Sequence, residues 1–179
     1  DFESIDVRTL LSPLVDEMAM RAKEKGLGFK AIIRSCWVRA DKTYLYRITQ
    51  NLLSNAVKYT ESGRVLFVVK PISNTVHFKI LDTGIGISND KKDSIFGDFF
   101  RANESKEHGI GLGLGVVRRL SLQLDSDIQV RSQIGKGSCF TFSLAKAESK
   151  VVSSETTKPR STTTSPCLAS STWANPNIS

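Results

Sequence analysis

Apolar residues recur at helical spacing in three stretches of the chain, at residues 9–24, 41–59 and 116–124. Gly26 follows the first stretch and marks the end of a helix there. Asp41 opens the second stretch, where its carboxylate can cap the free N–H groups of the first turn. The pattern therefore predicts three amphipathic helices.

Short extended segments lie between and after these helices, and they come in adjacent pairs. They cover residues 28–33 and 36–39, 65–71 and 75–81, and 126–131 and 138–144. Ser73-Asn74 joins the second pair, and Gly135-Lys136-Gly137 joins the third. We therefore predict an α/β fold of the α+β kind: a two-layer sandwich with a mixed, mostly antiparallel sheet of about five strands and three helices on one face.

The composition changes abruptly after Lys146. About half of the residues from Ser149 onward are Ser or Thr, without apolar periodicity, and such a segment cannot offset the entropy cost of ordering it. We interpret residues 1–146 as one domain and predict that residues 147–179 form a disordered tail or linker, or derive from an expression vector. Because the chain opens with Asp1 instead of Met, we expect it to be a piece of a longer protein.

The formal net charge of +7 suggests an anionic partner, and a nucleotide, a nucleic acid or a membrane surface fits it equally well. Much of the excess is scattered, as in Lys25 and Lys30, which is typical of a solvated face, so we expect no nucleic-acid partner. The three cysteines lie far apart, which implies neither a zinc site nor a disulfide framework and favours a reducing compartment. No apolar run reaches the ~18 residues of a membrane span. We expect a cytoplasmic location, whether the parent protein is soluble or membrane-anchored.

The second predicted helix carries a polar motif on one flank. Asn51, Asn55, Lys58 and Tyr59 fall within about 100° of one another on a helix that turns by ~100° per residue. A carboxamide oxygen is a hard ligand suited to Mg²⁺, an ammonium group can meet phosphate, and a tyrosine ring can cover a base or a ribose. A polar face turned to water would give the same pattern, so the motif alone leaves both interpretations open.

A second motif, Asp82-Thr83-Gly84-Ile85-Gly86, follows directly after a predicted strand. A carboxylate there can accept a hydrogen bond from an amino group such as adenine N6, and the glycines allow the backbone to approach a flat ligand. An ordinary turn has the same composition, so this signal is weak by itself.

A third motif groups Phe96, Phe99 and Phe100 with Arg101 in a charged loop. Such an aromatic cluster ordinarily pins a loop to the core. The planar fork of Arg101 could also reach a terminal phosphate.

The fourth motif is the glycine-rich run from Gly109 to Gly115, which leads into the third helix. Consecutive backbone N–H groups at a positive helix end form a phosphate cradle. The run lacks the Lys-Ser/Thr end of a P-loop and does not fit a dinucleotide fingerprint. A flexible hinge is the alternative interpretation.

In this order and spacing, the four motifs resemble the N, G1, F and G2 boxes of the catalytic ATP-binding domain of sensor histidine kinases. This domain belongs to the superfamily that also holds the gyrase B, Hsp90 and MutL ATPases. The resemblance covers residues 5–145 and includes the closing Gly135-Lys136-Gly137-Ser138 turn. It implies the Bergerat ATP-binding fold, with ATP and Mg²⁺ as ligands.

The resemblance also implies a role for each matching residue of the N box. Asn55 would coordinate Mg²⁺, assisted by Asn51. Lys58 would contact phosphate, and Tyr59 would pack on the nucleoside. With Arg101 near the γ-phosphate, the implied catalytic residues are Asn55, Lys58 and Arg101.

The other boxes would hold the base and the phosphates. Asp82 would bond adenine N6 directly and through water, in a base pocket lined by Gly84, Gly86 and Thr141. Residues 88–108 would form the ATP lid, and the phosphates would meet the backbone of Gly109, Gly111, Leu112 and Gly113. Ile110 stands where a hydroxyl residue is usual, and Gly115 where Ala or Ser is usual, which puts the nucleotide affinity in doubt more than the fold.

Hydrolysing members of the superfamily place a Glu, able to act as a general base, one helical turn before the Mg²⁺-binding Asn. Asn51 occupies that position here, so the resemblance implies phosphoryl transfer without an activated water. His77 and His108 are the only histidines, and neither has the acidic neighbour and downstream Pro of a phosphoacceptor helix.

The implied function is therefore donation of the γ-phosphoryl group of Mg·ATP to a histidine on a dimerisation and phosphoacceptor domain absent from this chain, in two-component signal transduction. A homodimeric parent and a downstream response-regulator receiver domain would complete the system. The alternatives are a binding or scaffold module of the same fold without catalysis, and a serine kinase or ATPase of the same superfamily.

Overall fold

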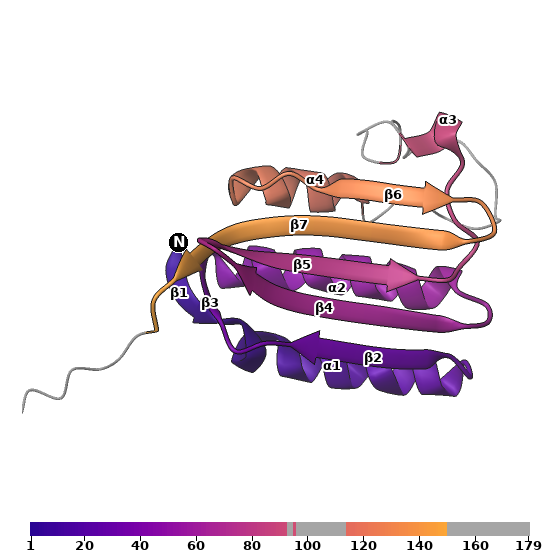
Figure 1. The fold of residues 1–179 in the computed structure, drawn as a ribbon, viewed down its shortest axis with the longest axis horizontal. Coiled ribbons are helices and arrows are strands. Elements are labelled where there is room, and N and C mark those ends of the chain that lie inside the picture. Colours follow the sequence, from indigo (N-terminus) through magenta and orange to yellow (C-terminus); the bar gives the residue numbers. More distant parts are fainter. Residues whose placement is uncertain (93–94, 96–113, 150–179) are drawn as a thin grey trace, which may run out of the picture.

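The computed structural model describes residues 1–92, 95 and 114–149 of the chain (Figure 1). The elements in chain order are β1 (Glu3–Asp6), α1 (Val7–Glu24), β2 (Gly28–Ile33), β3 (Trp37–Ala40), α2 (Lys42–Tyr59), β4 (Arg64–Ile72), β5 (Thr75–Asp82), α3 (Asn89–Lys92), α4 (Leu114–Gln123), β6 (Gln129–Gln133) and β7 (Gly137–Ala147). The three predicted helices correspond to α1, α2 and α4.

The strands form one mixed sheet in the order β1-β3-β7-β5-β4-β2, and β6 also pairs with β7. β2 runs parallel to β4, and the other described pairings are antiparallel. The predicted α+β class is confirmed, but the described sheet has seven strands where about five were expected. The unexpected strand β1 is four residues long and buries only Ile5, so it leaves little alternation in the sequence.

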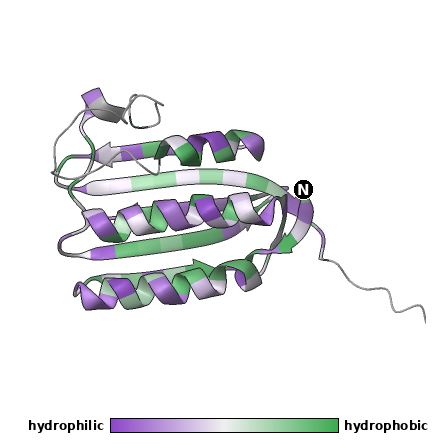
Figure 2. Ribbon diagram, turned by 180° about the vertical axis from the view of Figure 1, so that it is seen from behind, coloured by the Kyte–Doolittle hydropathy of each residue, from purple (hydrophilic) through white to green (hydrophobic). Residues whose placement is uncertain are grey.

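The helices α1, α2 and α4 lie on one face of the sheet, as Figures 1 and 2 show from opposite sides. Their apolar stripes meet the inward side chains of the strands, and Leu52 and Leu53 of α2 are fully buried there. On the sheet, the rings of Phe78 and Phe142 stack with centroids 4.6 Å apart. The core therefore lies between one layer of helices and one layer of strands, and the other face of the sheet has no helix in the described chain.

Pairing within the sheet brings distant residues to the same edge. β4 and β5 form a hairpin through Ser73 and Asn74, as predicted, and Ser73 has a φ of 53°. β5 and β7 pair along their length, from Thr75 opposite Ala145 to Asp82 opposite Ser138.

None of the described helices is long and apolar enough to span a bilayer.

Candidate nucleotide-binding site

The helix α2 is fixed at its first turn by the predicted cap. Asp41 Oδ1 accepts hydrogen bonds from the backbone N–H groups of Thr43, at 2.9 Å, and Tyr44, at 3.1 Å. These bonds satisfy donors that a helix leaves without partners at its start. The apolar side of α2 is buried, which fixes the rotation of the helix and hence the direction of its polar flank.

Two asparagines lie on that flank, and both are half-buried. The Asn51 side-chain amide donates to the Arg47 carbonyl at 2.9 Å, so its carboxamide nitrogen is already engaged. Asn55 makes no side-chain hydrogen bond with the described residues, so its amide can bind a ligand beside the helix. The asparagines lie one helical turn apart, as the sequence predicted.

Lys58 and Tyr59 form the last turn of α2. The Lys58 ammonium lies 5.1 Å from the centroid of the Tyr59 ring, within the range of a cation–π contact. Lys58 is exposed and Tyr59 half-buried. An exposed ammonium group and a half-buried aromatic ring thus lie next to each other at the end of the helix.

The C-cap residue of α1, Lys25, holds this end of α2. Lys25 donates through Nζ to the carbonyls of Val57, Lys58 and Thr60 at 2.8, 3.0 and 3.1 Å. These carbonyls belong to the unpaired C-terminal groups of α2, where a cation is favoured by the helix dipole. Lys25 is exposed, as its place among scattered charges in the sequence predicts, and it also positions the turn that carries Lys58 and Tyr59.

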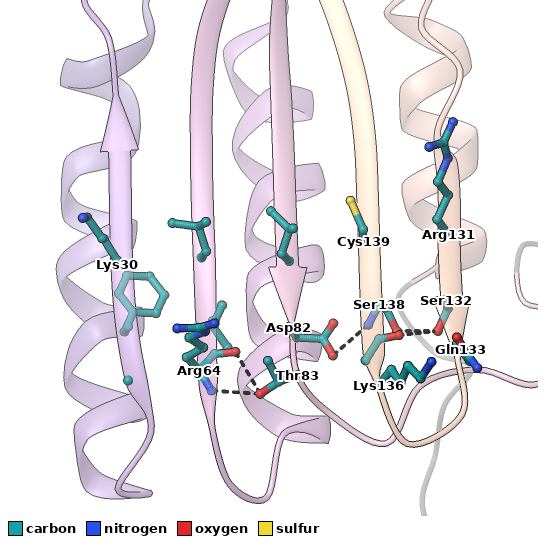
Figure 3. A pocket seen from close by; sticks show the side chains of 16 residues that line it. Lys30, Arg64, Asp82, Thr83, Arg131, Ser132, Gln133, Lys136, Ser138 and Cys139 are labelled. Atoms are coloured by element: carbon teal, nitrogen blue, oxygen red, sulfur yellow. Dashed lines mark hydrogen bonds between the residues drawn. The ribbon is translucent and has the colours of Figure 1, made fainter.

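Asp82 ends β5 and is half-buried beside β7 (Figure 3). Its Oδ1 accepts hydrogen bonds from the backbone N–H groups of Gly84, at 2.9 Å, and Ser138, at 3.2 Å. Burial raises the pKa of the Asp82 carboxyl above its usual range, and these two hydrogen bonds oppose the rise. No described residue donates to Oδ2, so this oxygen can accept a hydrogen bond from a ligand.

A backbone hydrogen bond connects the turn after Asp82 to the end of α2. The Ile85 N–H donates to the Tyr59 carbonyl at 3.2 Å, and the Ile85 carbonyl accepts from the Gly135 N–H at 2.8 Å. A side chain at Gly84 would collide with the same Tyr59 carbonyl. The structure therefore brings the C-terminal end of α2 and the Asp82 turn side by side.

The glycines of this turn serve close packing of the protein backbone. Gly86 has a φ of +72°, and a side chain there would collide with the backbone of Gln133. Glycine is the residue that adopts this conformation without strain. The sequence interpretation assigned both glycines to the approach of a flat ligand, and the described contacts of Gly84 and Gly86 are with protein.

Thr141 does not join the residues around Asp82. Thr141 lies three positions beyond Ser138 along β7, opposite Lys79. Its hydroxyl is 3.8 Å from the Cys139 sulfur. Cys139 and Thr141 alternate with the buried Phe140 and Phe142, so their side chains lie on the face of the sheet without helices. The base-pocket role expected for Thr141 is therefore not supported by its position.

Two serines that sequence analysis did not single out occupy the position beside Asp82. The Ser138 hydroxyl lies 2.9 Å from that of Ser132, and Ser132 also donates to the Gly137 carbonyl at 2.9 Å. The Ile87 N–H donates to Ser132 at 2.8 Å. The strand register is the signal that could identify Ser138 from the sequence, because antiparallel pairing of β5 with β7 puts the residue after Gly137 opposite Asp82.

Several predicted site residues lie outside the described residues. They are Arg101, Gly109, Gly111, Leu112 and Gly113, together with His108, Ile110 and most of the expected lid, and their roles stay predictions. α4 begins directly after this stretch with the buried Leu114 and packs against α2. His77 is half-buried in β5, with Nε2 3.0 Å from the Thr75 hydroxyl, which fits a histidine held within the sheet.

The family model described as "Histidine kinase-, DNA gyrase B-, and HSP90-like ATPase" matches residues 40–148, which include α2, Asp82 and β7. The chain belongs to this family. Its relatives include two sensor proteins. The aerobic respiration control sensor protein ArcB of Escherichia coli K12 is 37% identical over 152 residues, covering 80% of this chain and 20% of ArcB. The autoinducer 2 sensor kinase/phosphatase LuxQ of Vibrio vulnificus is 38% identical over 134 residues, covering 68% of this chain and 16% of LuxQ.

The crystal structure of full-length ShkA in complex with AMPPNP superposes with a TM-score of 0.71 at 32% identity, covering 83% of this chain and 32% of ShkA. The chain spans about a fifth of the length of the curated relatives it matches. These relatives confirm the predicted resemblance: the chain is an ATPase-type domain of the sensor histidine kinase kind.

The described residues fit the Mg²⁺ that the histidine-kinase-type domain implies. They contain no group of three or more acidic, histidine or cysteine side chains that could enclose a metal ion. Mg²⁺ is commonly held by few protein oxygens together with substrate phosphates and water. The Asn55 amide, without a partner in the described chain, suits such a shared site, and Asn51 is one turn away.

Proposed function

We propose that this chain binds Mg·ATP between α2 and the Asp82 turn and donates the γ-phosphoryl group to a histidine outside this sequence. The observation that carries the proposal is the junction of these two segments, through the Ile85 to Tyr59 hydrogen bond and the Gly84 packing. It joins the turn after the half-buried Asp82 to the end of the helix that carries Asn55 and Lys58, which supports one shared site. Family membership supports the same nucleotide class.

Asp82 would bind the adenine base at one end of the site. Its Oδ2 accepts a hydrogen bond from the N6 amino group, while Ser138 and Gly84 hold Oδ1 and so fix the plane of the carboxylate. Tyr59 packs on the nucleoside. The Asp82 carboxylate thereby favours an adenine, which has an amino group at this position, over a guanine, which has a carbonyl.

The phosphate end would be held from α2 and from the glycine-rich run. Asn55 and Asn51 hold Mg²⁺, which when bound neutralises phosphate charge. Lys58 contacts phosphate, Arg101 approaches the γ-phosphate, and the remaining contacts come from the backbone of Gly109, Gly111, Leu112 and Gly113. Phosphoryl transfer needs mainly position and charge neutralisation, which this set supplies.

Transfer is favoured over hydrolysis because the site has no general base at position 51. The Asn51 amide donates to the Arg47 carbonyl, and a carboxamide does not take up a proton from water at neutral pH. His77 is engaged with Thr75 within the sheet, so the acceptor histidine comes from the parent's dimerisation and phosphoacceptor helices. A homodimeric parent, a downstream receiver domain and a cytoplasmic location complete this proposal.

The proposal is tested by calorimetric titration with Mg·ATP and by transfer from labelled ATP to a supplied phosphoacceptor domain. We expect binding, transfer and little release of phosphate without the acceptor. Asn55→Ala should abolish transfer, while Asn74→Ala, at the exposed hairpin turn, should leave it unchanged. Absence of nucleotide binding would favour a non-catalytic module, and rapid phosphate release without the acceptor would favour a hydrolase.

A further inference from the structure

The face of the sheet opposite α1, α2 and α4 carries a row of five side chains that no described helix covers. The pairing register puts Lys30, Leu66, Leu81, Cys139 and Arg131 in line across β2, β4, β5, β7 and β6. Figure 3 shows this face in front of the helices, with Lys30 and Arg131 toward its two sides. Lys30 and Arg131 are separated by four strand spacings of ~4.8 Å each, so their Cα atoms lie about 19 Å apart.

This row lies in a hollow of about 950 Å³ (Figure 3). Its middle is aliphatic, and it is also lined by Arg64 and Lys136. In the part of the chain that the structure describes, none of these four cations forms an ion pair. Asp82 is the acidic residue in the lining, and backbone N–H groups already engage its Oδ1. The hollow is therefore positively charged around an apolar floor.

Charge and shape select among the possible occupants. Residues 150–179 contain three cationic residues and one acidic residue, and the whole chain carries +7, so neither this tail nor a second copy complements the hollow. Unstacked nucleic-acid bases bind on aromatic faces, and Phe29, at the β2 side, is the single aromatic residue that lines this hollow. A flat lipid surface would rest on the rim and leave the floor uncovered. An acidic protein element with an apolar side satisfies both the rim and the floor.

We propose that this hollow docks an acidic amphipathic helix of a partner protein. An α-helix rises 1.5 Å per residue, so about twelve residues span the ~19 Å between Lys30 and Arg131. Carboxylates at the two ends of that span meet the two cations, and apolar residues at helical spacing between them cover Leu66 and Leu81. The row from Lys30 to Arg131 is on the opposite face of the sheet from α2, and the docked helix covers this row and not Asp82, which the lining of the hollow shares with the candidate nucleotide site.

The test titrates the full chain with a synthetic peptide of about sixteen residues, with glutamates at both ends and leucines at helical spacing between them. Fluorescence anisotropy measures its affinity at several salt concentrations. Alkylation followed by peptide-resolved mass spectrometry reports the access to Cys139, with Cys167 of the tail as the reference. We expect affinity that falls with salt, and alkylation of Cys139 slowed about threefold or more by the peptide.

Charge reversal identifies the surface. Lys30→Glu with Arg131→Glu should weaken binding about tenfold or more, whereas Lys23→Glu, on the exposed side of α1, should leave it unchanged. Lys30→Ala and Arg131→Ala, both at exposed side chains, replace the double variant if that variant does not fold.

Three results would overturn the proposal. They are no binding at about 1 mM peptide, equal binding by a scrambled peptide of the same composition, and equal binding by the reversed variant. Binding of single-stranded DNA or of phosphatidylserine vesicles with the same dependence on Lys30 and Arg131, in place of the peptide, would also overturn it by assigning the face to that ligand.

Discussion

At the scale of single residues, the candidate site depends on the different roles of the two carboxylate oxygens of Asp82. Oδ1 is taken up by the Gly84 and Ser138 N–H groups, and Oδ2 has no partner in the described chain. The protein thus fixes one oxygen and offers the other. Replacement of Oδ2 alone separates recognition from folding.

Asp82→Asn makes that replacement. The amide oxygen can accept the same two backbone hydrogen bonds, but its NH₂ group then faces the adenine amino group, donor against donor. We expect the affinity for ATP to fall about 30-fold or more, which corresponds to ~2 kcal/mol, while thermal stability does not fall. Calorimetry with Mg·ATP measures the loss, and Asp16→Asn on the exposed side of α1 is the control. Unchanged ATP affinity in Asp82→Asn would remove Asp82 from the adenine site.

The raised pKa of Asp82 predicts a pH dependence of stability. Because burial raises the folded-state pKa above that of the unfolded chain, the folded protein holds a proton where the unfolded chain has lost it. Stability contributed by this group is therefore full below the ordinary Asp pKa of about 3.9 and falls as the pH rises through the folded-state pKa. As the pH rises through this range, the unfolding temperature of the wild type should fall relative to that of Asp82→Asn. A constant difference across the window would contradict the burial of the charged carboxylate.

At the scale of elements, the site depends on the relation between the end of α2 and its neighbours. Thr60 donates through its hydroxyl to the Ala56 carbonyl at 2.7 Å, and Lys25 joins three more carbonyls. The Ile85 N–H then connects the same end to the Asp82 turn. Each of these contacts restrains the backbone that carries Lys58 and Tyr59.

Lys25→Met tests this restraint because methionine keeps the length of the side chain and removes its ammonium group. We expect a loss of about 1 kcal/mol in the free energy of unfolding, or ~3–5 °C in the unfolding temperature, together with weaker ATP binding. Lys23→Met, two residues earlier and exposed, should change neither. Lys25→Arg should recover part of both losses, and a Lys25→Met variant as stable as the wild type would show that the three hydrogen bonds are dispensable.

At the scale of the whole molecule, local signals could be predicted from the sequence and long-range contacts could not. The Asp41 cap and the Ser73-Asn74 turn involve neighbours in the chain, and both were anticipated. Lys25 and Val57 are separated by 32 residues, and Asp82 and Ser138 by 56. No spacing rule reaches across such intervals, so the sequence predicts neither the contacts of Lys25 with the end of α2 nor the hydrogen bond between Ser138 and Asp82.

The sheet topology shows the same limit. Helices and strand pairs follow from periodicity, but the parallel pairing of β2 with β4 joins segments on either side of α2. The bare face of the sheet, with its row from Lys30 to Arg131, exists only because that pairing aligns five strands. Lys30 is therefore one scattered charge in the sequence and becomes part of a row only in the folded sheet.

The domain boundary gives the last prediction. β7 ends at Ala147 and pairs with β5, β6 and β3, so the described sheet is complete at residue 149. Residues 150–179 contribute no predicted strand or helix, and their Ser and Thr content does not offset an ordering cost of about 1–2 kcal/mol per residue. We therefore expect a chain cut after Ser149 to keep its unfolding temperature within about 2 °C and its affinity for ATP within about twofold. A chain cut after Phe140, which removes seven of the eleven residues of β7, should fail to fold. Differential scanning calorimetry and ATP titration of both chains decide the matter: a loss of stability or affinity in the first would mean that the tail packs on the domain.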